Sequence, residues 1–121
     1  MQHKTALVVD SNPNSRELIR ILLEHEGYRT VETGDSVEAV ELASATSPDL
    51  VLIDLQMPRL EGYATAKKLR QSGRFKKLIV ALTGRELDSD PAQISAAGFT
   101  ATISKPVVLR GLHERLSQIH A

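Results

Sequence analysis

The residues of this sequence best suited to chemistry are two aspartates, a threonine and a lysine at the ends of short apolar runs. Asp10 ends the stretch TALVVD, Asp54 ends DLVLID, Thr83 ends KLIVALT and Lys105 follows ATIS. An aspartate can act as a nucleophile toward phosphorus, and a lysine, a hydroxyl donor and a divalent cation stabilise the charge on the transferred group. Together these residue types suit phosphoryl transfer to a carboxylate.

Two kinds of segment alternate along the chain and must position these side chains. Short apolar runs predict strands at 5–10, 28–33, 49–54, 77–83 and 101–104. Helical periodicity predicts a helix that begins at Asn12-Pro13 and stops at Gly27, followed by helices at 36–46, 61–73, 90–97 and 107–119. We expect Ser36 to cap the second helix and Ala64 to lie on the inward face of the third.

The alternation of strands and helices predicts an α/β fold with a parallel sheet, helices on both of its faces and right-handed crossovers. In open sheets of this kind, ligands bind outside the carboxyl ends of the strands. Taken singly, Asp10 suits a helix cap, Thr83 an ordinary strand residue and Lys105 a solvated charge. Their expected convergence with Asp54 at one edge of the sheet favours a functional site over these plainer interpretations.

Composition narrows the class of protein. The 121 residues fit one domain that spans 1–121, and the absence of cysteine excludes a disulfide scaffold, a thiolate zinc site and a cysteine nucleophile. Fifteen basic and fifteen acidic residues cancel, and the aromatic residues are only two Phe and two Tyr, which argues against nucleic-acid binding. No segment reads as a signal peptide or a membrane span, so we expect a cytoplasmic protein without membrane contact.

Three stretches carry a resemblance to a known family. DLVLIDLQMPRLEG at 49–62, IVALTG at 79–84 and ISKPV at 103–107 resemble the receiver domain of two-component response regulators, in order and at suitable spacing. The resemblance implies a flavodoxin-like (βα)5 fold, a doubly wound five-stranded parallel sheet of order 2-1-3-4-5. The loop SNPNSR at 11–16 further resembles receivers of hybrid histidine kinases, and whether the chain stands alone or is part of a longer protein stays open.

The same resemblance implies roles for single residues in a phosphorelay. Asp54 would accept a phosphoryl group from a histidine kinase or a histidine phosphotransfer domain, Lys105 would contact the acyl phosphate through a cis bond to Pro106, and Thr83 would hydrogen-bond a phosphate oxygen. Mg²⁺ would be held by Asp10, Asp54 and the backbone carbonyl of Gln56. Such a phosphoprotein signals rather than turning over a substrate, and at most it catalyses its own phosphorylation and dephosphorylation.

Several positions depart from the family pattern. Receivers usually place a second acid after the first, where this chain has Ser11, a weak or absent ligand that predicts a weakened magnesium site. Thr102 stands where receivers commonly have Tyr or Phe, which puts the usual coupling to the threonine in doubt. Gln56 and Arg85 occupy positions that influence loss of the phosphoryl group in receivers.

Other functions stay open beside the receiver hypothesis. A pseudo-receiver would keep the fold and act as a phosphorylation-independent interaction module, as Ser11 and Thr102 suggest. Aspartyl-phosphate phosphatases generally need an aspartate where Gln56 stands, and a flavin mononucleotide site would need a phosphate cradle that the first loop lacks. By the resemblance, a homodimer or partner face is expected over 90–97, 101–104 and 107–119, including Thr102, Arg110 and His113.

Overall fold

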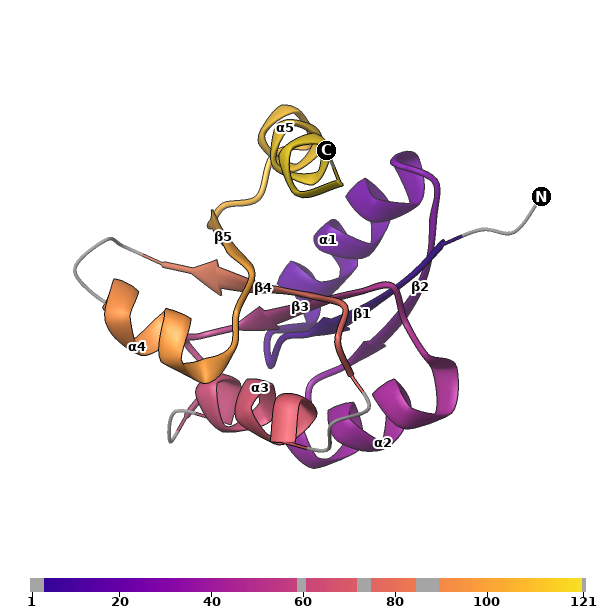
Figure 1. Cartoon of the computed structure of the whole chain (residues 1–121). Coiled ribbons are helices and arrows are strands. Elements are labelled where there is room, and N and C mark those ends of the chain that lie inside the picture. The colour runs from indigo at the N-terminus through magenta and orange to yellow at the C-terminus, as the bar shows by residue number, and fades with distance from the viewer. Residues whose placement is uncertain (1–3, 59–60, 72–74, 85–89, 121) are drawn as a thin grey trace.

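Within the described residues, five strands form one sheet in the middle of the structure (Figure 1). The computed structural model describes residues 4–58, 61–71, 75–84 and 90–120. The strands are β1 (Lys4–Val9), β2 (Tyr28–Thr33), β3 (Leu50–Asp54), β4 (Leu78–Thr83) and β5 (Ala101–Ser104). Their order is β2-β1-β3-β4-β5 and every pair is parallel, which confirms the predicted flavodoxin-like fold class.

Helices cover both faces of the sheet, which suits the continuous apolar runs 6–9, 50–53 and 78–82 in the central strands. Helices α1 (Pro13–His25) and α5 (Leu109–His120) lie on one face, and α2 (Ser36–Thr46), α3 (Glu61–Gln71) and α4 (Pro91–Ala97) lie on the other (Figure 1). Two separate buried clusters follow from this layering. The α1/α5 cluster is built from Ile19, Leu23, Leu112 and Leu116 against strand residues such as Val8, Leu52 and Leu82.

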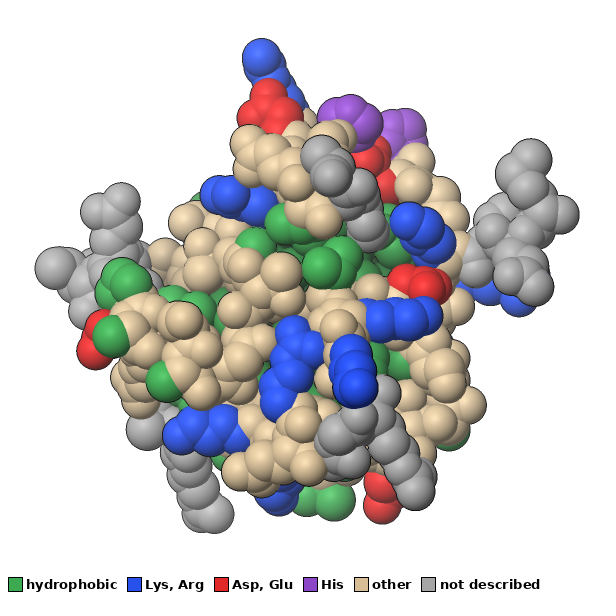
Figure 2. Space-filling view, viewed as in Figure 1, with side chains coloured by type: hydrophobic (Ala, Val, Ile, Leu, Met, Phe, Trp, Pro, Cys, Tyr) green, Lys and Arg blue, Asp and Glu red, His purple; other side chains and the backbone are tan. Residues whose placement is uncertain are grey.

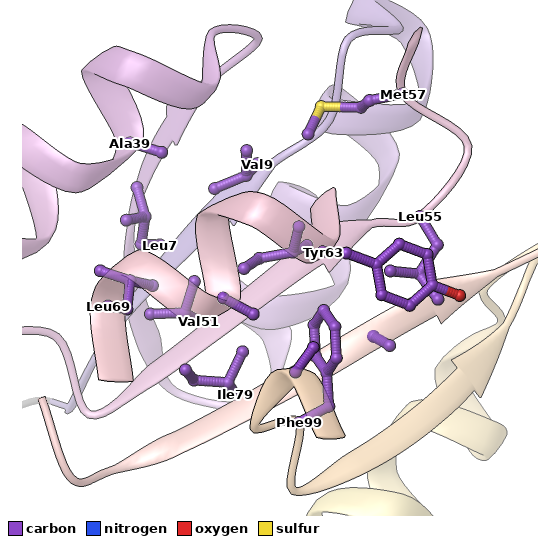
Figure 3. Close-up of a cluster of buried hydrophobic side chains, with 14 of the residues drawn as sticks. Leu7, Val9, Ala39, Val51, Leu55, Met57, Tyr63, Leu69, Ile79 and Phe99 are labelled. Carbon is purple, nitrogen blue, oxygen red and sulfur yellow. The ribbon is translucent and has the colours of Figure 1, made fainter. Parts of the chain in front are cut away.

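The cluster on the other face is larger and contains the buried aromatic residues of α3 and the α4–β5 connection (Figure 3). Tyr63 and Phe99 meet edge to face, with ring centroids 6.2 Å apart and an interplanar angle of 85°. Such pairs stabilise beyond their buried area. Phe99 therefore belongs to the core, and it ties the start of β5 to α3.

Local signals explain where α1 begins and ends. The side chain of Asn12 accepts hydrogen bonds from the backbone N–H groups of Asn14 (2.9 Å) and Ser15 (3.2 Å), and Pro13 opens the helix. After the helix, Gly27 adopts a φ of 92°, a left-handed conformation that glycine tolerates best. The predicted cap, first residue and stop of this helix are all confirmed.

Two predictions about the other helices are wrong. Asp35, not Ser36, caps α2, because its carboxylate accepts the N–H of Val37 at 2.8 Å and Ser36 is already helical. In α3, Ala64 is exposed, whereas Tyr63 and Ala66 are buried. Gly62 lies close against the end of β3, and in the orientation that α3 adopts there, position 64 faces outward.

Charge is unevenly spread although the net charge is zero. The segment from residue 62 to residue 84 contains six basic residues and no acidic one. Figure 2 shows several lysine and arginine side chains close together in the lower half of that view. Lys77, just before β4, forms an ion pair of 3.0 Å with Asp49, just before β3. Among the described helices, none is long and apolar enough to cross a membrane.

Candidate functional site

Asp10 lies one residue beyond β1 and is fully buried at the carboxyl edge of the sheet. Three donors bind its carboxylate. Oδ1 accepts the backbone N–H of Asn12 at 2.9 Å, and Oδ2 accepts both the hydroxyl of Ser15 at 2.6 Å and the ammonium of Lys105 at 2.7 Å. Because a buried carboxylate needs such partners, this network makes Asp10 the best-satisfied acid of the site.

Asp54 ends β3 next to Asp10, because β3 pairs with β1 in the middle of the sheet. Its side chain is 5% exposed, and Oδ2 lies 3.3 Å from Nζ of Lys105. Oδ1 accepts the backbone N–H of Gln56 at 2.9 Å. The structure thus brings together two carboxylates and one ammonium that are separated by up to 95 positions in the sequence.

The two carboxyl groups differ in their electrostatics. Burial acts to raise the pKa of Asp10, but hydrogen bonds from Lys105, Ser15 and the N–H of Asn12 outweigh burial and hold that pKa below its ordinary value. Burial raises the pKa of Asp54, and the negative charge of Asp10 adds to the increase. One ammonium shared by two acids leaves a net negative charge, and Asp54 is the less stabilised of the two anions.

The other two strand ends complete the same edge. Thr83 is the last residue of β4 and is buried, and its carbonyl accepts the backbone N–H of Lys105 at 2.7 Å. The Lys105–Pro106 peptide bond is cis, as the resemblance implied. Ser104, the last residue of β5, is exposed. Asp10, Asp54, Thr83 and Lys105 therefore all lie where the strand pattern predicted.

Sequence reasoning missed two residues of this site, both on the first turns of α1. Ser15 binds Asp10 through its hydroxyl, and Nη1 of Arg16 donates to the backbone carbonyl of Asp10 at 2.8 Å. Arg16 also approaches Glu32 of β2 at 3.5 Å. The available signal was the run of polar residues that opens the helix directly after a buried acid, where their side chains point back toward the strand end.

Two glycines allow the loops to come close to Asp54. A side chain at Gly62 would meet the backbone oxygen of Asp54 at 2.5 Å, so only glycine lets α3 start there without displacement. A side chain at Gly84 would collide with the amide of Gln56, which lies across the β4 end. Gln56 is exposed and covers this side of the site. Arg85 lies outside the described residues.

The donor set is compatible with magnesium, which prefers carboxylate, carbonyl and water oxygens. Asp10 and Asp54 supply two carboxylates, and the loop that binds Asp54 brings the backbone of Gln56 alongside. Ser11 is exposed and offers only a hydroxyl. The described part of the chain contains no group of three or more His, Cys, Asp or Glu side chains placed to hold a metal ion.

The three residues expected on a partner face differ in exposure and contacts. Thr102 is half-buried in β5 and Arg110 is exposed on α5. His113 is exposed, and its Nδ1 lies 2.6 Å from a carboxylate oxygen of Glu26 at the end of α1. This contact joins α5 to α1.

Comparisons with known proteins agree with the geometry. The family model of the response regulator receiver domain matches residues 6–117. The polar-differentiation response regulator DivK of Brucella anthropi is 33% identical over 105 residues, which are 86% of this chain and 85% of that protein. The CheY-like receiver domain from Methylobacillus flagellatus superposes with a TM-score of 0.86 at 26% identity, over 98% of this chain and 99% of that chain.

A second solved structure bears on the metal. The receiver domain of the sensor histidine kinase PA1611 from Pseudomonas aeruginosa has a TM-score of 0.84 and 29% identity, covering 97% of each chain. That structure has a magnesium ion coordinated in its active site cleft.

Proposed function

The chain belongs to the response regulator receiver domain family of two-component signal transduction, and we propose that it accepts a phosphoryl group on Asp54 from a phosphohistidine donor. The observation that carries the proposal is the position of Nζ of Lys105, 2.7 Å from Asp10 and 3.3 Å from Asp54. A buried carboxylate beside an ammonium at the carboxyl edge of the sheet is suited to attack phosphorus and to bind the group it receives.

The proposed step transfers one phosphoryl group. An oxygen of Asp54 attacks the phosphorus, so that a P–O bond forms while the P–N bond to the donor histidine breaks. The imidazole nitrogen leaves with the bonding electron pair and takes up a proton from solvent. Lys105 follows the negative charge from the carboxylate to the phosphoryl oxygens, and the hydroxyl of Thr83 at the neighbouring strand end donates to one of them.

A bound magnesium ion would neutralise charge on the phosphoryl oxygens. Asp10, Asp54 and the carbonyl of Gln56 would hold it, with Ser11 contributing a hydroxyl at most. Because the adjacent second acid is missing, we propose that this cation is bound more weakly than a site with three carboxylates would bind it.

A pseudo-receiver is the second candidate, and one observation favours it. Asp10 already has three hydrogen-bond donors, and Ser11 adds no charge to compensate for their loss when a cation binds. In that case the fold would recognise partners without phosphorylation.

Beryllofluoride, a mimic of the acyl phosphate, distinguishes the two candidates. We expect ¹⁹F NMR to show beryllofluoride bound to the wild type in excess magnesium, no binding to Asp54→Ala, and binding at lower magnesium in Ser11→Asp. Binding by Ser11→Asp alone would favour the pseudo-receiver, because a single restored acid would then switch on a lost function. Binding to Asp54→Ala would contradict the assignment of the acceptor.

The proposal extends to the setting of the domain. Residues 1–121 would form one receiver domain that meets a histidine kinase or a histidine phosphotransfer domain in the cytoplasm. A homodimer through α4, β5 and α5 would use Thr102, Arg110 and His113, the last of which also contacts Glu26.

A further inference from the structure

We infer that Ser15 is a positioning residue that sets how tightly the site binds a divalent cation, by holding Asp10 in its metal-free arrangement. The inference rests on the proposed function, since it concerns the same cation. It concerns a residue that neither the motifs nor the family resemblance singled out.

The hydroxyl of Ser15 competes for the oxygen of Asp10 that faces Asp54. That oxygen, Oδ2, accepts Ser15 at 2.6 Å and Lys105 at 2.7 Å. A carboxylate oxygen has about two lone-pair sites, so both sites of Oδ2 are filled. Lys105 also lies 3.3 Å from Oδ2 of Asp54, so Oδ2 of Asp10 is on the side of the site that the two acids share.

Ser15 is the less mobile of these two donors. Lys105 has a long side chain that is 19% exposed, so its ammonium can swing toward solvent or toward a phosphoryl group. Ser15 has a short side chain on α1, and its own backbone N–H is fixed by the cap residue Asn12 at 3.2 Å. The hydroxyl therefore stays beside Asp10, and a cation, or a water molecule that it carries, would have to displace this hydrogen bond to bind Oδ2.

The expected size of the effect follows from the hydrogen bond that is lost. A hydrogen bond to a charged group is stronger than one between neutral groups, but part of the loss is recovered when the freed hydroxyl binds water. A fivefold change in the dissociation constant corresponds to about 1 kcal/mol, since 1.4 kcal/mol is tenfold. Removing the hydroxyl should therefore tighten cation binding by about fivefold.

Two other roles of Ser15 predict a different effect of Ser15→Ala on the affinity for the cation. If Ser15 kept its bond to Asp10 while the cation was bound, it would orient a ligand, and its removal would weaken binding. If Ser15 only anchored the start of α1, its removal would change stability and leave the affinity unchanged.

The test measures the dissociation constant for magnesium by calorimetric titration, and that for manganese by electron paramagnetic resonance. Both are measured in two backgrounds, the wild type and Ser11→Asp. In each background, the parent protein is compared with variants that carry Ser15→Ala, Ser15→Thr or Ser117→Ala. Ser15→Thr keeps a hydroxyl at the site, and Ser117→Ala removes a helix-borne hydroxyl of α5 that bonds only the carbonyl of His113 among the described residues. Circular dichroism verifies that each variant is folded.

We expect Ser15→Ala to lower the dissociation constant about fivefold in both backgrounds, and Ser15→Thr and Ser117→Ala to leave it unchanged. An unchanged or higher dissociation constant in Ser15→Ala would overturn the inference while leaving the proposed function standing. If neither the wild type nor Ser11→Asp bound either metal, the metal dependence in the proposed function would fail, and this inference with it.

Discussion

The ammonium of Lys105 lies 2.7 Å from an oxygen of Asp10. The same nitrogen is 3.3 Å from an oxygen of Asp54, so one ammonium group contacts two buried carboxylates. Asp10 has further donors in Ser15 and the N–H of Asn12, whereas Asp54 has the N–H of Gln56. The ammonium of Lys105 therefore stabilises the negative charge of Asp10 more than that of Asp54. The carboxylate of Asp54, the proposed nucleophile, is the less neutralised of the two.

This arrangement predicts that Asp54→Asn stabilises the fold at neutral pH. Burial and the charge of Asp10 raise the pKa of Asp54, so the folded protein holds that proton more tightly than the unfolded chain. The contribution of Asp54 to the free energy of unfolding therefore decreases as the pH rises from 3.8, its ordinary pKa, through its higher pKa in the folded protein. We therefore expect Asp54→Asn to have a higher free energy of unfolding than the wild type at pH 7.

Urea unfolding of the wild type and of Asp54→Asn across a pH series checks the sign. The gain should shrink as the pH falls toward 3.8 and vanish below it. A gain that stayed constant down to the lowest pH at which both proteins fold would show that ionisation of Asp54 is not its cause.

Asp10→Ala should have the opposite effect. The charged form of Asp10 is favoured in the folded protein, since Lys105, Ser15 and the N–H of Asn12 together outweigh burial in lowering its pKa. Its contribution is therefore present above the ordinary pKa of 3.8 and is lost as the pH falls through the lower folded value. We expect a loss of about 2–3 kcal/mol at pH 7, because buried donors are left without their acceptor.

Asp35→Ala is a matched control for this loss. It removes an exposed cap carboxylate that binds one N–H, and it should cost about 1 kcal/mol. Equal losses in the two variants, measured by urea unfolding at pH 7, would show that the network around Asp10 adds nothing beyond a surface cap.

Gly62→Ala should destabilise the protein by about 2 kcal/mol or more. Its new Cβ would lie 2.5 Å from the backbone oxygen of Asp54, which cannot move without shifting the end of β3. Gly111→Ala is the matched control in α5, where the nearest atom, Cγ2 of Val108, would be at an ordinary 3.5 Å. We expect that variant to be neutral or more stable by about 0.5–1 kcal/mol, because alanine favours a helix. Equal melting temperatures for the two variants would contradict the close approach of α3 to Asp54.

Arg70 should contribute more stability than the exposed Arg110 of α5. Its guanidinium donates to the carbonyls of Gly98 (3.0 Å) and Lys77 (2.7 Å), and thereby joins the end of α3 to the segments before β4 and β5. Arg70→Met keeps much of the side-chain volume and should lower the free energy of unfolding by about 1–3 kcal/mol. Arg110→Met removes only a surface pair with Glu114 and should change it by less than about 0.5 kcal/mol. A loss in Arg110→Met as large as that in Arg70→Met, by chemical denaturation, would contradict this assignment.

The sequence sufficed to predict the convergence of Asp10, Asp54, Thr83 and Lys105, because parallel strands present their carboxyl ends at one edge whatever the details of packing. The rotation of individual helices was harder to predict. Ala64 and Ala66 are the same residue type, and the way in which α3 packs on the sheet leaves Ala64 exposed and Ala66 buried.

The cap of α2 and the role of Ser15 were missed for related reasons. Asp35 and Ser36 both suit a cap, and the first helical residue is decided by how the chain leaves β2. Ser15 reads as an ordinary helix residue, and its bond to Asp10 depends on the angle at which α1 leaves the sheet. Such contacts depend on tertiary geometry, which residue type and spacing do not encode.

The most direct test of the account is the intact mass of the protein after incubation with acetyl phosphate in excess magnesium, followed by mapping of the modified residue. We expect one added phosphoryl group on the wild type, located on Asp54, and none on Asp54→Ala. An unmodified wild type at every magnesium concentration, or equal modification of Asp54→Ala, would contradict it.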